Sequence, residues 1–290
     1  MEMPNIYIVT DSTSDMPQSV QEQYGIHVVP LKVHFGEKTY LDGVDLTPDQ
    51  FYELLAKSDT LPTTSQPSPA EFLETYKRIL EKDPDAHIIS VHISAAFSGT
   101  YQSAQLAKNL LGDDAPVTVL DSKTTSYALG WMAVAMAKAA ARGESVEACI
   151  QKAEAIRRST GLYFLVDTLE YLQKGGRIGK AAALAGSLLN IKPILSIDEE
   201  GEVTSVDKVR GRKRAIERII ELLKKQFPSD QEVVAFFPQA SAETGAATLR
   251  DRVVENFRVR ESDYTFIGPV LGTHVGPGTF AVIMVPADHG

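Results

Sequence analysis

The chain has 290 residues, of which 43% are hydrophobic, and its net charge of −9 argues against a general nucleic-acid-binding protein, which needs a basic face. Its single cysteine, Cys149, excludes an internal disulfide and a cysteine-cluster metal site, and we expect it to be a buried helix residue. The sequence contains neither an apolar run long enough for a membrane span nor a signal-peptide pattern, which predicts a soluble, cytoplasmic protein.

Short apolar segments alternate with amphipathic segments through the first half of the chain, a pattern typical of an α/β protein. Pro17 and Gly25 bracket one predicted helix, and a capping box of Ser68 and Glu71 starts another. The alternation predicts right-handed crossovers and a mainly parallel sheet with flanking helices. We expect extended segments at 6–10, 26–35, 87–93 and 117–120, and helices at 17–25, from 47 onward, and at 68–81, 101–111, 128–141 and 146–158.

The pattern changes near residue 161, where hairpins become mixed with helices. A turn ending at Gly201 joins two predicted strands, which favours a smaller α+β second domain. We therefore expect an N-terminal α/β domain at 1–160 and a C-terminal α+β domain at 161–290. The predicted strands are 162–166, 193–197, 203–209, 233–237, 265–267 and 280–285, and the predicted helices are 169–173, 180–189, 213–226 and 242–256.

Three loops rich in serine and threonine, at 10–15, 63–68 and 94–100, follow predicted strands. Ligands of open α/β sheets bind outside the carboxyl ends of the strands, and hydroxyl and helix N-terminal N–H groups suit an anion. Ordinary helix capping explains each loop equally well. Together with Asp121, the first loop's Asp11 and Asp15 offer carboxylates for Mg²⁺, but acidic residues before a helix are commonly caps, so we expect no metal.

The sequence lacks the usual signatures of catalysis and cofactor binding. Residues 175–180 resemble a phosphate-binding loop, but the spacing is one residue short and Ala181 replaces the hydroxyl that binds Mg²⁺. No dinucleotide-binding glycine motif or nucleophile elbow is present, and the six histidines are scattered.

Two further segments stand out. His274 lies in the glycine-rich segment 272–278, which we predict to be a loop that approaches a ligand closely, with a turn carrying an incidental histidine as the alternative. Residues 210–214 carry four cations where a helix is predicted to start, and cations there oppose the helix dipole. That run is either a solvated face or a site for an anion or an acidic partner.

The segments 10–15, 64–68, 98–104, 175–179 and 272–278 together resemble the DegV family, in the family's order and over almost the whole chain. The resemblance implies a two-domain protein that binds one long-chain fatty acid, such as palmitate, stearate or oleate, in a tunnel between or within its domains. Some bacterial members present this fatty acid to a separate fatty-acid kinase, which makes acyl phosphate from ATP. The resemblance thus implies a lipid carrier of fatty-acid metabolism rather than an enzyme, with no cofactor.

Carried over by the resemblance, the hydroxyls that bind the carboxylate fall on Thr64 and Ser98. Many members have a small or aliphatic residue where this chain has Phe97, which would shorten or bend the tunnel if it points inward. The remaining expected contacts with ligand or partner are Ser65, Gly99, Arg177, His274, Arg210 and Arg212.

Two alternatives to the carrier remain open. One is an enzyme acting on a small anionic substrate, with His274 as acid or base and the hydroxyl loops as an oxyanion site. The other is an interaction or regulatory protein whose lipid is structural. For a carrier, burial is worth about 0.8 kcal/mol per methylene, so the tail would set the affinity and the hydroxyls the orientation.

Overall fold

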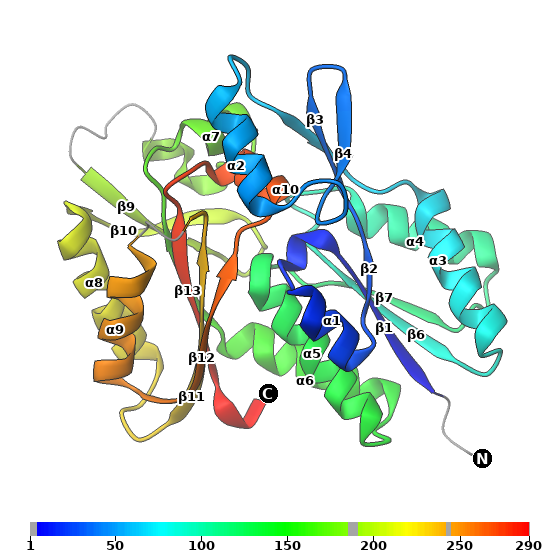
Figure 1. The fold of residues 1–290 in the computed structure, drawn as a ribbon. Coiled ribbons are helices and arrows are strands. Elements are labelled where there is room, and N and C mark those ends of the chain that lie inside the picture. The colour runs from blue at the N-terminus through cyan, green and yellow to red at the C-terminus, as the bar shows by residue number, and fades with distance from the viewer. Residues whose placement is uncertain (1–4, 185–190, 242–244, 290) are drawn as a thin grey trace.

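The computed structural model describes residues 5–184, 191–241 and 245–289 and contains three sheets, as Figure 1 shows. The first is fully parallel, as the alternation predicted, with the order β2-β1-β6-β7. Its strands are β1 (Ile6–Asp11), β2 (His27–Val29), β6 (His87–His92) and β7 (Val117–Asp121). The helices of this part are α1 (Gln18–Tyr24), α3 (Pro69–Lys82), α4 (Thr100–Leu111), α5 (Ser126–Ala141) and α6 (Val146–Ser159), and η1 (Ser12–Ser14) is a 3-10 turn.

Helices cover both faces of the parallel sheet. On one face, Phe72 and Tyr76 of α3 and Ala104 of α4 pack against the strands in one core cluster. On the other, α5 contributes an almost wholly buried, alanine-rich surface that includes Trp131. Cys149 is a free, buried residue of α6, as expected. Among the described residues, no helix is both long and apolar enough to cross a membrane.

The second sheet has six strands in the order β10-β9-β8-β13-β11-β12 and is antiparallel except for the β11–β12 pair. This confirms the predicted fold class. The strands are β8 (Gly161–Leu165), β9 (Ile191–Ile197), β10 (Val203–Arg210), β11 (Glu232–Gln239), β12 (Arg258–Phe266) and β13 (Phe280–Pro286). The helices are α7 (Glu170–Lys174), α8 (Arg212–Gln226), α9 (Ala246–Asn256) and α10 (Pro269–Val275), with 3-10 turns η2 (Gly179–Leu184) and η3 (Ala287–His289).

This six-stranded sheet is packed between helices of both halves of the chain. Helices α8 and α9 cover one face (Figure 1). On the other face, the ring centroid of Phe236 lies 4.6 Å from that of Tyr127 and 4.8 Å from that of Trp131, both in α5. The contact between α5 and the six-stranded sheet is therefore apolar and close, as the absence of a flexible linker in the sequence suggested. The division into two domains at residue 160 remains a proposal; it falls between the end of α6 and the start of β8.

A third, three-stranded antiparallel sheet has the order β4-β3-β5 and was not predicted. Its strands are β3 (Lys32–Phe35), β4 (Lys38–Leu41) and β5 (Thr63–Ser65), and α2 (Pro48–Lys57) packs against it. The expected extended segment 26–35 is divided at Pro30 between β2 and β3. The sequence predicts a loop at Thr63–Ser65, but this polar segment is itself a strand.

The prediction for the segment 272–278 was wrong, because α10 covers its first four residues. Pro269 occupies the first helical turn, where its fixed φ suits a helix, and within the helix only Gly272 is a glycine. Gly276 and Gly278 follow with positive φ values and form the turn into β13.

Three other expectations need adjustment. The helix predicted at 180–189 is a 3-10 turn over its first residues, and 185–189 lie outside the described residues. The helix predicted at 242–256 begins at Ala246, and 242–244 are likewise not described. The strand predicted at 265–267 is the end of the longer β12.

Candidate ligand-binding site

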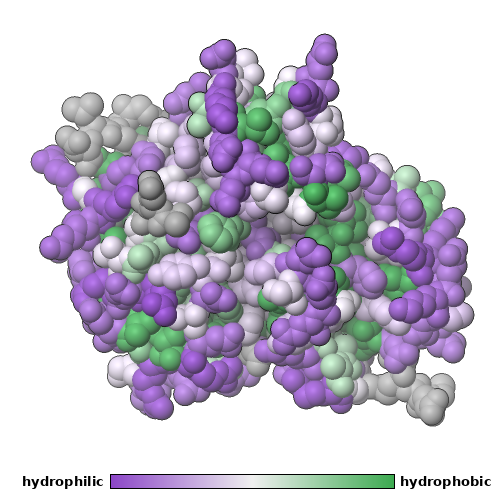
Figure 2. Space-filling view, viewed as in Figure 1, coloured by the Kyte–Doolittle hydropathy of each residue, from purple (hydrophilic) through white to green (hydrophobic). Residues whose placement is uncertain are grey.

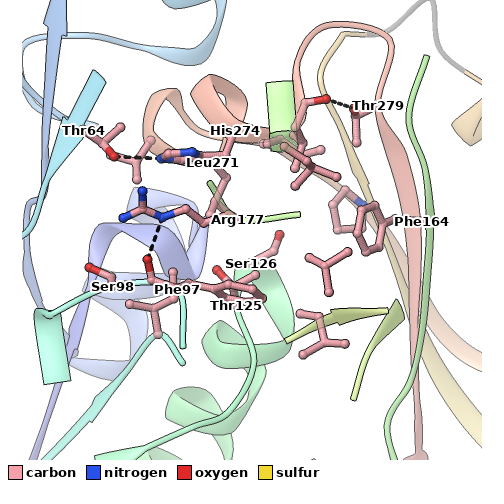
Figure 3. A pocket seen from close by; sticks show the side chains of 18 of the residues that line it. Thr64, Phe97, Ser98, Thr125, Ser126, Phe164, Arg177, Leu271, His274 and Thr279 are labelled. Carbon is pink, nitrogen blue, oxygen red and sulfur yellow. Dashed lines mark hydrogen bonds between the residues drawn. The ribbon is translucent and has the colours of Figure 1, made fainter. Parts of the chain in front are cut away.

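A mostly apolar cavity lies where the carboxyl edge of the parallel sheet meets the antiparallel sheet, α10 and β5 (Figure 3). Its empty space is about 950 Å³, counting the part open to solvent. The apolar lining residues are Leu31, Ile93, Phe97, Leu162, Phe164, Leu172, Ile197, Val203, Pro238, Ile267, Val270, Leu271, Val275, Ala281 and Ile283.

Polar groups of the lining gather around α10. Thr64 Oγ1 and His274 Nε2 share a hydrogen bond of 2.8 Å, which joins β5 to α10 (Figure 3). In that view the Arg177 guanidinium lies between this pair and Ser98. The structure thus brings together four side chains that the sequence predicted as site residues, from segments far apart in the chain.

His274 is mostly buried, and burial together with the charge of Arg177 lowers its pKa to about 4. The ring is therefore neutral near pH 7, with one donor and one acceptor nitrogen. Its Nδ1 has no hydrogen-bond partner among the described residues. If Nε2 carries the proton and donates to Thr64, the Thr64 hydroxyl is left free to donate into the cavity.

Arg177 is held by backbone carbonyls. Its Nε donates to the carbonyl of Phe97 at 3.0 Å, and its Nη1 donates to that of Gly175 at 2.7 Å. Among the described residues, no carboxylate lies within ion-pair distance of Arg177. A half-buried cation without a counter-ion is suited to an anionic ligand.

Ser98 precedes α4, and its hydroxyl hydrogen-bonds to Thr100 Oγ1 at 2.8 Å. Ser65 also lines the cavity, although its hydroxyl hydrogen-bonds to His34 Nε2 at 2.9 Å. Phe97 is another lining residue of the cavity, and its effect on the path of a bound chain stays a prediction.

Three predicted contact residues do not line the cavity. Gly99 packs against Gln66, whose Nε2 lies 2.9 Å from the position that a Cβ would take. Arg210 is exposed at the end of β10. Arg212 makes an ion pair with Asp167 at 2.9 Å and lies over the ring of Phe280, 5.7 Å from its centroid.

Four polar lining residues were not predicted from the sequence: Gln66, Thr125, Ser126 and Thr279. Thr125 and Ser126 follow β7 at the same sheet edge. The rule that pointed to the other loops would have found them, had it been applied to the polar segment 121–126. Gln66 lies in the segment 64–68 that carries the family resemblance, but nothing in that resemblance predicts a role for it.

The carboxyl edge also holds two buried carboxyl groups. Asp15 accepts hydrogen bonds from the Ser126 hydroxyl at 2.6 Å and from the amide of Gly268 at 2.8 Å. Burial, and less strongly the charges of Asp42 and Asp11, raise the pKa of Asp15 to about 8. Burial and the charge of Asp11 raise the pKa of Asp42 to about 7. These groups connect the parallel sheet to the start of α10.

The Mg²⁺ alternative has no geometric support. Asp121 Oδ1 accepts from the amides of Ala95 and Lys123, while Asp11 binds the ring of His92. Nowhere in the described part of the chain do three acidic, histidine or cysteine side chains gather as a metal site.

A buried chain of hydrogen bonds has the order of a Ser-His-Asp triad. Ser90 Oγ lies 2.7 Å from His92 Nε2, and His92 Nδ1 lies 3.0 Å from Asp11 Oδ2. However, all three residues are fully buried, none lines the cavity, and Ser90 also accepts a hydrogen bond from Tyr76. With no route for a substrate, the chain is a structural network within the sheet.

Comparison with known proteins gives matches over nearly the whole chain. The family model described as "Uncharacterised protein, DegV family" matches residues 5–287. Protein DegV of Bacillus subtilis is 38% identical over 279 residues, covering 96% of this chain and 98% of that protein.

Solved structures match as closely. A DegV family protein from Thermus thermophilus, described by its fatty-acid binding, has a TM-score of 0.91 and 37% identity over 97% of this chain and 99% of that one. Bacillus subtilis DegV, described as a fatty acid binding protein, has a TM-score of 0.88 and 36% identity over 98% and 99%. A stearic acid-binding protein from Eubacterium ventriosum has a TM-score of 0.87 and 28% identity over 98% of each chain. These relatives are described as binding proteins, not as enzymes.

Proposed function

This chain belongs to the DegV family, and from that premise we propose that it binds one long-chain fatty acid, such as palmitate, stearate or oleate, in the cavity. The observation that carries the proposal is the asymmetry of the cavity. Thr64, Ser98, Arg177 and His274 gather at one part of it, and the remaining wall is mostly apolar. Such a site matches a molecule with one anionic end and a long apolar tail.

The carboxylate would lie at Thr64 and Ser98. A buried carboxylate needs donors, because leaving it unpaired costs several kcal/mol. Thr64 can donate its proton when His274 Nε2 donates to it, and Arg177 supplies a positive charge that pairs with no carboxylate of the described residues. Each hydroxyl would add about 0.5–1.5 kcal/mol, or up to about 3 kcal/mol toward a charged group.

The tail would supply most of the affinity. Burial of a methylene is worth about 0.8 kcal/mol, so a tail of about fifteen methylenes gains on the order of 12 kcal/mol before the costs of ordering the chain. Phe97 also lines the cavity, and its ring would bend the path of the chain.

The fatty acid would then be presented to a fatty-acid kinase in the cytoplasm. Thr64 and Ser98 are partly exposed and the neighbouring Gln66 is exposed, so a carboxylate bound there lies close to the surface. This position favours transfer of a phosphoryl group by a partner, which fits the incomplete phosphate-binding motif at 175–180. The basic run at 210–214 would contribute to docking.

The enzyme alternative has less support in the geometry. A general base needs a third group that orients it, as a carboxylate does in a triad. His274 Nδ1 lies against Gly175 instead and has no hydrogen-bond partner among the described residues.

Native mass spectrometry of the purified protein, followed by denaturing extraction, tests the proposal. We expect one acyl chain per protein, and added palmitate or oleate should raise the melting temperature of delipidated protein. A ligand that binds only the folded state raises the free energy of unfolding by about 2.7 kcal/mol when its concentration is a hundred times Kd. Absence of both bound lipid and stabilisation would refute lipid binding. Turnover of a phosphate or carboxylate ester by the protein alone would support the enzyme alternative.

A further inference from the structure

The lipid cavity is separated from a second cavity by two side chains. Leu162 in β8 and Ile197 at the end of β9 line both of them. Both residues are only partly buried, although each belongs to a strand of the six-stranded sheet. Side chains that have empty space on both sides form a thin wall.

This wall lies further along the sheet than the end of the cavity that α10 and His274 form. Leu162 pairs with Ile283, which also lines the lipid cavity. The chain enters β13 at Phe280, soon after α10 and His274, and Ile283 is three residues further on. At about 3.3 Å per residue, the row of Leu162 and Ile283 lies about 10 Å further along the strand.

Ile197 belongs to the same row. Phe164 of β8 pairs with Leu195 of the antiparallel β9, so Leu162 lies opposite Ile197, two residues further along. The Ser196 hydroxyl donates to the carbonyl of Leu162 at 2.7 Å, which fixes the two strands together at this point.

The space beyond the wall is different in character. It offers about 1,280 Å³ of empty space, counting the part open to solvent. Ala128 and Met132 of α5 form its apolar floor. The rest is polar or charged and comprises Lys123, Thr124, Arg157, Arg158, Thr160, Asp198 and Glu199.

We propose that Leu162 and Ile197 stop the methyl end of the acyl chain and so set the longest fatty acid that the protein holds. This inference rests on the proposed fatty-acid binding. A chain that fits up to the wall gains about fourfold in affinity per methylene. A longer chain must displace the wall toward charged side chains or lose its carboxylate contacts, so its affinity falls.

The test is a series of saturated fatty acids from C12 to C22, each used to displace a fluorescent fatty acid from delipidated protein. Leu162→Ala removes three carbon atoms from the wall and joins the two cavities. We expect the preferred length to rise by about two carbons, and the ratio of C20 to C16 affinity to rise about tenfold. Ile197→Ala should act in the same direction. Leu162→Phe should act in the opposite one and shorten the preferred length.

Leu172→Ala is the matched control. It also removes three carbon atoms from the cavity lining, but Leu172 belongs to α7, which packs on α10 and does not line the second cavity. Its ratio of C20 to C16 affinity should equal that of the wild type. The inference is overturned if Leu162→Ala and Leu172→Ala give the same length profile, or if Leu162→Phe, which keeps the wall filled, leaves the profile unchanged. A wild-type protein that binds no fatty acid of any length would refute the proposed function instead.

Discussion

The backbone of Gly175 lies directly against Nδ1 of His274, and a Cβ at position 175 would occupy the same space as that nitrogen. The φ angle of Gly175 is −73°, which any residue adopts, so its backbone conformation does not require glycine. Glycine is required here because the imidazole ring approaches the backbone so closely. The backbone of Gly175 therefore limits the position of the imidazole ring and keeps Nε2 directed at Thr64.

We predict that Gly175→Ala weakens fatty-acid binding by about tenfold, because the methyl group pushes the ring of His274 away from Thr64 and the carboxylate loses an oriented hydroxyl. Calorimetric titration of delipidated protein with palmitate measures the effect.

Gly176→Ala is its control. Gly176 has a φ of +70° and nothing near its missing Cβ, so the change strains only the backbone. It should lower stability by about 1–2 kcal/mol and leave palmitate affinity unchanged. Equal loss of palmitate affinity in both variants would show that binding depends on the backbone of this segment and not on the position of the His274 ring.

Thr64→Val and Ser98→Ala test the carboxylate site. Thr64→Val keeps the shape of the side chain and removes the hydroxyl, so a loss of affinity reports the hydrogen bond itself. We expect each change to weaken palmitate binding about tenfold, and the double change to do so more than additively, because both hydroxyls serve one ligand. Unchanged affinity in all three variants would place the carboxylate elsewhere.

Local signals in the sequence predicted most of the elements, whereas the family resemblance of its motifs pointed to the polar part of the site. Pro17, Ser68 and Gly25 mark helix ends through their own side chains or backbone, and the structure has helix ends beside each. Thr64, Ser98, Arg177 and His274 were identified from motifs, and they all line one cavity.

The wrong or missing predictions concern contacts that are distant in the chain. Thr63–Ser65 became a strand because it pairs with Lys32–His34, which lies about thirty residues earlier and gives no local signal. His274 was expected in a loop because a count of glycines does not show which of them fall inside the helix. The wall of Leu162 and Ile197 depends on which strands pair, and an apolar residue in a strand looks the same whatever it faces.

The buried carboxyl groups predict how stability depends on pH. Asp15 has a pKa of about 8 in the folded protein, well above its unfolded value, so the folded state holds a proton that the unfolded state releases. This stabilisation is complete below about pH 4 and is lost as the pH rises toward 8. Asp42, with a pKa of about 7, acts in the same direction.

Urea unfolding between pH 5.5 and 8.5 measures this dependence. Asp15→Asn keeps the shape, tolerates the left-handed backbone at φ 49°, and should flatten the decline in unfolding free energy with pH. Asp207→Asn is the control, because Arg218 lowers the pKa of Asp207 and that group stays ionised throughout. A decline that is equally steep in Asp15→Asn would show that Asp15 is not the group responsible.

The buried chain from Tyr76 to Asp11 predicts a loss of stability without a loss of binding. Ser90→Ala leaves the hydroxyl of Tyr76 and Nε2 of His92 unpaired in the core, at a cost of about 2–4 kcal/mol. Thermal unfolding and palmitate titration separate the two effects. Ser103→Ala, at a buried serine whose hydroxyl makes no hydrogen bond within the described residues, should cost much less. Loss of binding in Ser90→Ala, with stability unchanged, would give this network a functional role.

The last prediction concerns the basic run at 210–214. Arg212 is already used within the fold, since it pairs with Asp167 and covers Phe280. Arg210, Lys213 and Arg214 are exposed, and none makes an ion pair within the part of the chain that the structure describes. They lie at the first turn of α8 or just before it, where positive charge opposes the helix dipole, which suggests a role outside the fold.

If these cations dock an acidic kinase surface or help neutralise phosphate charge, complementary charge should mainly speed the encounter. The double change Arg210→Glu and Arg214→Glu should then lower acyl-phosphate formation with a fatty-acid kinase at least tenfold, and leave palmitate affinity and melting temperature nearly unchanged. The wild-type rate should itself fall as salt is raised. The pair Lys224→Glu and Lys225→Glu, at the exposed far end of the same helix, is the matched control and should leave the rate near that of the wild type. Equal loss of lipid binding and phosphorylation in the arginine variant would place these residues at the cavity instead, whereas full activity would make the run a solvated face.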